Sequence, residues 1–135
     1  MAVQANTPGG LGKLVGSWNV EIAPSGQGAV PGLMTFTSDG IVLGDEPPMP
    51  FETTAHGNWV ATGPQEAAYT FVALIGNAED KPASRLKLVG ALTYNAQADT
   101  WRGPFKLDLF NATGQSTMAV DGTVSGTRIV VERLS

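Results

Sequence analysis

Cysteine is absent from this sequence, and histidine occurs only once, at His56. The lack of cysteine excludes a disulfide framework, a thiol nucleophile and a thiolate metal site, and a single histidine excludes a cluster of imidazole ligands. A glycine-rich phosphate loop, a Gly-x-Ser-x-Gly elbow and a dinucleotide-binding fingerprint are missing as well. We therefore expect neither a metal site nor a cofactor.

Positive charge and long apolar runs are also scarce. Eight basic residues are scattered along a chain whose formal net charge is −4. A protein that binds the phosphate backbone of a nucleic acid needs clustered Lys and Arg, so we expect no nucleic-acid partner. No apolar stretch approaches the roughly 20 residues of a membrane helix, so we expect no membrane partner either.

The first residues, Met1 to Gly10, have neither the basic patch nor the apolar run of a signal peptide. We therefore expect a cytoplasmic protein, and a presequence cleaved from a longer chain is the alternative that stays open. Glycine and proline at Thr7-Pro8-Gly9-Gly10 disfavour regular structure, so residues 1–12 are predicted to be a flexible lead-in. Residues 13–135 are predicted to form one domain.

The chain does have segments in which apolar and polar residues alternate, and it has many turn residues. In Leu14–Ile22, Trp18 and every second residue after it are apolar, and the residues between them are polar, as in a strand with one wet face. Seventeen glycines and nine prolines favour short strands joined by tight turns. Further strands are predicted at Leu33–Thr37, Ile41–Leu43, Thr53–Ala61, Ala67–Ile75, Arg85–Tyr94, Trp101–Leu109, Ser116–Val124 and Thr127–Leu134, with a two-residue turn at Ser125-Gly126 before the last.

About nine short strands at hairpin spacing, with no convincing helix, indicate an all-β, up-and-down meander. Closing such a meander into an antiparallel barrel of about eight strands hides its edges completely. A β-sandwich is the alternative, because Pro104 would suit an edge strand, although Gly103-Pro104 would also suit a bulge in a barrel.

The Gly16-Ser17-Trp18 motif at the head of the first strand resembles the opening signature of the calycins, the group of lipocalins, fatty-acid-binding proteins and avidins. That resemblance implies a closed barrel whose Trp plugs one end beneath a late Arg, here Arg128. Three further motifs are similar to those of small bacterial calycin-like barrels: Thr35–Gly40, Gly57–Pro64 and Gly126–Ile129.

A proline-rich segment, Gly44–Phe51, follows the third predicted strand. Its three prolines cannot lie in a central strand, whereas Met49 and Phe51 favour burial. We interpret it as a lid over the barrel mouth, with an ordinary crossover as the alternative.

These features predict a barrel that binds a small, largely apolar molecule in an interior cavity. The pocket is expected to open beside the proline-rich segment. The ligand-binding candidates are Phe36, Met49, Phe51, Asn58, Trp59, Phe71, Leu88, Tyr94, Trp101 and Phe105.

The alternative is a cofactor-independent cyclase, isomerase or epoxide-opening enzyme that uses the same cavity. Its acid and base candidates are His56, Tyr69, Asp45 and Glu46, although each has a structural explanation as an exposed or core side chain. An interaction domain with a filled barrel is a third hypothesis. Homo-oligomer formation is also considered, through outward-pointing Val72, Leu74, Val89 and Val130.

Overall fold

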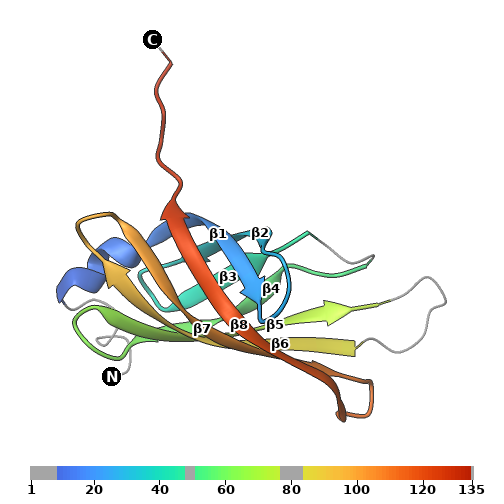
Figure 1. Ribbon diagram of the computed structural model, residues 1–135. Coiled ribbons are helices and arrows are strands. Elements are labelled where there is room, and N and C mark those ends of the chain that lie inside the picture. Colours follow the sequence, from blue (N-terminus) through green and yellow to red (C-terminus); the bar gives the residue numbers. More distant parts are fainter. Residues whose placement is uncertain (1–8, 48–50, 77–83, 135) are drawn as a thin grey trace.

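The protein, described here by a computed structural model over residues 9–47, 51–76 and 84–134, is a closed barrel of eight antiparallel strands (Figure 1). Each strand pairs with the next along the chain, and β8 pairs with β1. The predicted architecture is confirmed, and one closed sheet excludes the sandwich. The elements are a 3-10 helix η2 (Gly9–Leu14) and the strands β1 (Gly16–Pro24), β2 (Val30–Phe36), β3 (Ile41–Asp45), β4 (Ala55–Ala61), β5 (Glu66–Ile75), β6 (Ser84–Asn95), β7 (Thr100–Phe110) and β8 (Ser116–Arg128).

The period of two decides which side chains enter the barrel. In β6 buried and exposed residues alternate without a break from Arg85 to Asn95. Leu86, Leu88 and every second residue after them face inward, and the residues between them face outward. Tight turns join the strands, and the predicted Ser38-Asp39-Gly40 turn is confirmed, with Gly40 at a φ of 94°.

The predicted ninth strand is wrong. β8 runs without interruption through Ser125 and Gly126, which pair with Arg102 and Trp101 of β7. Gly126 is required there because a Cβ atom would overlap the Trp101 indole, and no turn is involved. Residues 129–134 form no strand and project away from the barrel (Figure 1). Gly103-Pro104 is likewise no bulge, since β7 keeps its register with β8 there.

Helix η2 closes one end of the barrel. It begins at Gly9, inside the segment predicted to be a lead-in, and its Leu11 and Leu14 are fully buried. The Trp18 indole N–H donates a hydrogen bond to the Leu14 carbonyl at 3.0 Å, which attaches the helix to β1. A buried indole needs such a partner, so this end is sealed by both apolar contact and a hydrogen bond.

Arg128 lies across this closed end. Register places Arg128 of β8 directly opposite Trp18 of β1, and the guanidinium carbon lies 4.3 Å from the indole centroid. The predicted Trp–Arg contact is therefore confirmed. A Cβ at Gly16 would lie 2.7 Å from an Arg128 nitrogen, so glycine is needed for the close approach. Arg128 also donates to the Val15 carbonyl at 3.1 Å and to the Lys13 carbonyl.

Asp99 completes the contact. Its two carboxylate oxygens accept hydrogen bonds from Arg128 Nε at 2.6 Å and from Nη2 at 3.1 Å, and Tyr94 donates a third at 2.8 Å. The β6–β7 turn, β8 and the end of η2 are thus held at one point. These hydrogen bonds, that from Arg128 above all, hold the pKa of Asp99 below its usual range.

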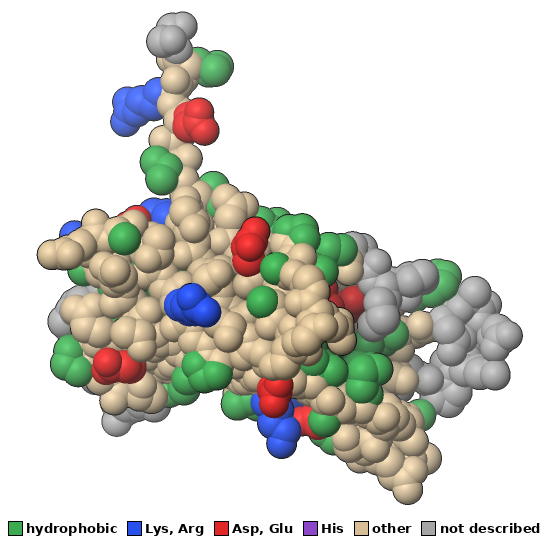
Figure 2. Space-filling model, viewed as in Figure 1, with side chains coloured by type: hydrophobic (Ala, Val, Ile, Leu, Met, Phe, Trp, Pro, Cys, Tyr) green, Lys and Arg blue, Asp and Glu red, His purple; other side chains and the backbone are tan. Residues whose placement is uncertain are grey.

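The outer surface is mixed in character. The face shown in Figure 2 carries a few acidic and basic side chains, some of them side by side, interspersed with hydrophobic ones. Val72, Leu74, Val89 and Val130 all lie outside the core, and Val130 is 67% exposed on the projecting segment. In the described parts of the chain, no helix is long and apolar enough to span a bilayer.

Replacing Trp18 by alanine should lower the free energy of unfolding by about 3–5 kcal/mol, because it leaves a cavity and removes the surface on which Arg128 lies. Urea denaturation followed by circular dichroism measures this loss. Val60→Thr, on the outer face, is the control and should change stability by less than about 0.5 kcal/mol. A loss below about 1 kcal/mol for Trp18→Ala would contradict the sealed end.

Replacing Asp99 by asparagine should destabilise the protein at neutral pH and have progressively less effect in acid. The pKa of Asp99 is lower when folded, so its contribution is present above the unfolded value of about 4 and is lost as pH falls through the folded value. Urea denaturation at pH 7, 5 and 3 tests this, with Glu21→Gln as the surface control. A stability difference that does not shrink in acid would be the contrary result.

Candidate functional site

The middle of the barrel is filled with aromatic rings. Phe36 lies at the centre and makes edge contacts with Trp59, Tyr69 and Trp101 at centroid distances of 5.7, 6.1 and 5.8 Å. Trp18 extends the cluster toward the closed end through an edge contact with Trp101 at 6.2 Å. Of the predicted ligand-binding residues, Phe36, Trp59 and Trp101 therefore lie in a packed core, and space for a ligand has to be sought at the opposite end.

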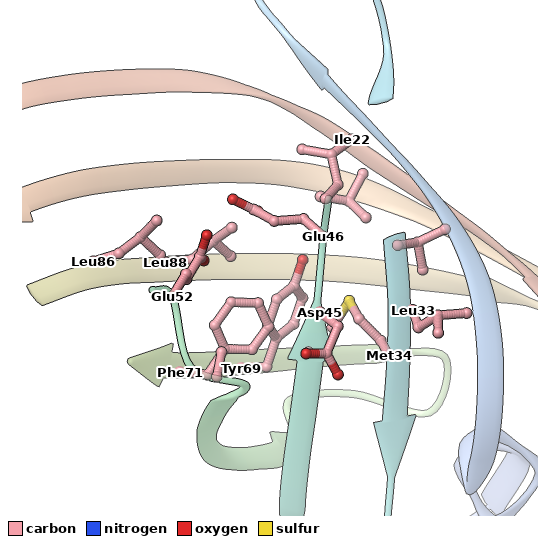
Figure 3. Close-up of a pocket in the computed structure, with 14 residues that line it drawn as sticks. Ile22, Leu33, Met34, Asp45, Glu46, Glu52, Tyr69, Phe71, Leu86 and Leu88 are labelled. Carbon is pink, nitrogen blue, oxygen red and sulfur yellow. The ribbon is translucent and has the colours of Figure 1, made fainter. Parts of the chain in front are cut away.

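An inner pocket lies at that opposite, open end, next to the last residues of β3. Its walls are mostly apolar, and Tyr69 and Phe71 of β5 form one side (Figure 3). The cavity volume is about 20 Å³, measured over the positions that a water centre can occupy, which is room for about one water molecule. Its lining comprises Val20, Ile22, Leu33, Met34, Gly44, Asp45, Glu46, Glu52, Ala55, Tyr69, Phe71, Leu86, Leu88 and Val124.

Two glycines give these aromatic rings their positions. A Cβ at Gly44 would lie 2.7 Å from the Phe71 ring, and a Cβ at Gly90 would overlap the Tyr69 phenol. Gly90 pairs with Tyr69 across β5 and β6, so the ring lies flat over the neighbouring strand. Because Gly44 and Gly90 have no side chains, the Phe71 and Tyr69 rings can lie against these positions and reach the pocket.

A wider apolar cleft, of about 470 Å³, continues outward from the inner pocket. The two share Ile22, Glu46 and Leu86. The outer ends of β7 and β8 form much of its wall, and there Leu107 and Leu109 are only half-buried. Its other lining residues are Pro24, Gln27, Val30, Pro47, Phe105, Met118 and Val120.

Glu46 lies where the inner pocket meets the cleft, and Glu52 lines the inner pocket beside it. Figure 3 shows Glu46 and Glu52 extending toward one another over the inner pocket. Partial burial and, secondarily, the charge of Glu52 raise the pKa of Glu46. The apolar entrance therefore carries an acid that holds its proton more strongly than an exposed glutamate does.

The Tyr69 hydroxyl is the deepest polar group of the inner pocket. Tyr69 is 2% exposed, and among the described residues its oxygen has no hydrogen-bond partner. Burial raises the pKa of this phenol far above its normal value, so it stays neutral and acts as a hydrogen-bond donor or acceptor. A buried hydroxyl without a partner is costly, and the adjoining space is large enough for one small polar group.

Other predicted site residues are spread over the molecule. His56 and Asn58 are exposed on the outer face of β4, on the side opposite to Trp59, and neither faces the interior. Tyr94 lies at the closed end and bonds to Asp99. The structure thus separates His56 from Tyr69, although their strands are neighbours, because their side chains leave the sheet on opposite faces.

The predicted lid is described only in part. Gly44 and Asp45 belong to β3, and Asp45 is exposed and accepts a hydrogen bond from Thr54 at 2.9 Å. Phe51 is 61% exposed, with a φ of 68°, so its ring does not enter the barrel. Met49 lies outside the described residues. Phe71, Leu88 and Glu46 line the inner pocket, and Phe105 lines the cleft.

Sequence reasoning missed Glu52 and most of the cleft lining. In β7 every second residue is apolar as far as Leu107 and Leu109, and this alternation predicts that both face inward. It does not predict that they are only half-buried. Glu52 gave no signal, because its position depends on a bridge to Ile75 of β5 that no local pattern specifies. No group of three His, Cys, Asp or Glu side chains suited to a metal occurs within residues 9–47, 51–76 and 84–134.

Replacing Tyr69 by phenylalanine should leave the free energy of unfolding unchanged or raise it by up to about 1 kcal/mol, because it removes a buried hydroxyl without a protein partner and keeps the ring. Urea denaturation measures the change. Tyr94→Phe is the matched control and should destabilise the protein, because its hydroxyl is bonded to Asp99. A clear loss of stability in Tyr69→Phe would show that this hydroxyl serves the fold.

Comparison with known proteins gives no match: no protein-family model, no curated protein and no solved structure resembles the chain closely enough to be assigned to it.

Proposed function

We propose that this barrel binds a small, largely apolar molecule at its open end, in the cleft above the inner pocket. The observation that carries the proposal is the contrast between the two barrel ends. At the closed end Leu11, Leu14 and Trp18 are fully buried, whereas at the open end inward-facing Leu107 and Leu109 are only half-buried. Apolar side chains on the inside of a barrel that remain accessible favour an apolar occupant.

The dimensions of the cleft support this function. Ligand pockets typically measure about 300–1,000 Å³, and the cleft has about 470 Å³. An interior ligand comparable in size to those of large barrels would have to displace the aromatic core around Phe36, which is packed through several ring contacts. The proposed site is therefore a mouth site. The resemblance to calycin-like barrels implies an apolar ligand in an interior cavity. We keep that class of ligand as part of the proposal and place its site at the mouth of the barrel instead.

Leu109→Ser should weaken the binding of an apolar ligand about five- to tenfold, because it removes roughly 1–1.4 kcal/mol of apolar contact. The probe is N-phenyl-1-naphthylamine, an apolar fluorophore that is uncharged at neutral pH, titrated while its emission is recorded. Val89→Ser, on the outer face of β6, is the matched control and should bind as the wild type does. Equal weakening in both variants would place the probe outside the cleft, and no binding to the wild type would refute the proposal.

A cofactor-independent enzyme that acts in the same cleft is the second candidate, and the raised pKa of Glu46 favours it. In its protonated form the Glu46 carboxyl group is suited to donating its proton to an epoxide oxygen while water adds to carbon. The resulting carboxylate then takes a proton from the added water, which leaves a diol and restores the acid. Incubation with limonene oxide, followed by mass spectrometry, tests this reaction. Diol formation that Glu46→Gln loses and Glu21→Gln keeps would establish the enzyme. No diol with the wild type would leave binding as the function.

A further inference from the structure

We infer that the apolar ligand carries a primary amine, and that its ammonium group occupies the inner pocket between the Tyr69 hydroxyl and the carboxylates of Glu46 and Glu52. This inference rests on the proposed function and specifies its ligand class. The ligand body would then lie in the outer cleft, along Leu107 and Leu109.

The charge of the pocket favours a cation. Two acidic side chains, Glu46 and Glu52, extend over the inner pocket, and their ionised forms favour a cation there. Asp45 also borders the pocket but is exposed and hydrogen-bonded to Thr54, and none of the described lining residues is basic. The outer cleft adds Gln27 and no basic residue among those described. A carboxylate ligand would meet like charge in an apolar setting, where repulsion is screened little. A fatty acid is therefore a poor fit, and an amine of similar shape is a good one.

The Tyr69 hydroxyl is a separate indication that the ligand has a polar head group. It is almost completely buried, it lines the inner pocket, and it has no hydrogen-bond partner among the described residues. Figure 3 shows its oxygen on the side of the pocket where Glu46 lies. Because the phenol is neutral, its oxygen is able to accept a hydrogen bond from an ammonium N–H. The Tyr69 and Phe71 rings, whose centroids are 5.9 Å apart, also present aromatic surface to the cation.

The size of the inner pocket restricts the head group further. The cavity has room for about one water molecule, and an –NH₃⁺ group is of similar size. A trimethylammonium group is much larger and would meet the buried walls formed by Met34, Leu88 and Val124. The geometry therefore selects a primary amine over a quaternary one with the same body.

Four ligands with the same eight-carbon chain test this inference: octylamine, octanol, octanoate and octyltrimethylammonium. Each is used to displace N-phenyl-1-naphthylamine from the wild-type protein. A charge-assisted hydrogen bond is worth about 1.5–3 kcal/mol, so octylamine should bind at least about tenfold more tightly than octanol. Octanoate should bind most weakly, and octyltrimethylammonium should bind no better than octanol.

Variants of the pocket residues test whether the preference for octylamine over octanol arises in the inner pocket. Glu46→Gln and Tyr69→Phe should each lower the affinity for octylamine severalfold and leave that for octanol nearly unchanged. Glu21→Gln removes the same charge on the outer face of β1 and should keep the full preference. Circular dichroism confirms that each variant is folded, and Glu52→Gln provides a second test of the carboxylates.

The possible failures are distinguishable. Equal affinities for octylamine and octanol, or a preference that survives Glu46→Gln and Tyr69→Phe, would overturn the amine inference and leave the apolar site intact. Equal binding of octylamine and octyltrimethylammonium would overturn the placement of the head group in the inner pocket. Failure of all four ligands and of the fluorophore to bind would refute the proposed function itself.

Discussion

The contact of Arg128 with Trp18 and Asp99 is the interaction on which the arrangement of this barrel depends. One guanidinium lies on an indole from the first strand, pairs with a carboxylate from the β6–β7 turn, and donates to carbonyls of Lys13 and Val15. Such a group is costly to bury unless its donors are satisfied. Here the carboxylate and the carbonyls satisfy several of them, so charge, stacking and hydrogen bonding all favour the same closed end.

The two ends of the interior differ in how completely they are filled. Aromatic packing extends from Trp18 through Trp101 and Phe36 to Tyr69 and Phe71, and Tyr69 also lines the inner pocket. Farther along the barrel, Leu107 and Leu109 still pack against the core but are only half-buried. Tyr69 therefore belongs both to the aromatic core and to the lining of the inner pocket.

The sequence predicted the barrel well because strand periodicity and turn residues act locally. The Gly40 turn is confirmed for that reason, whereas the contact of Arg128 with Trp18, also confirmed, was expected from the resemblance to the calycins and from no local pattern. The ninth strand was wrong because Gly126 resembles a turn residue, although glycine is needed there for the indole of a neighbouring strand. The site was less predictable. Whether His56 faces inward depends on the register between strands, and the place of Glu52 depends on a bridge between distant residues.

The pairing of β1 with β8 has a consequence for how the protein is made. Residues 18–24 are synthesised about a hundred positions before their partners in residues 122–128. Until those partners leave the ribosome, β1 has an open edge on one side, and Trp18 lacks the arginine that covers it. Contacts over such sequence distances make folding slow. The barrel therefore cannot close until β8 has been synthesised, and the edge of β1 stays without its partner strand until then.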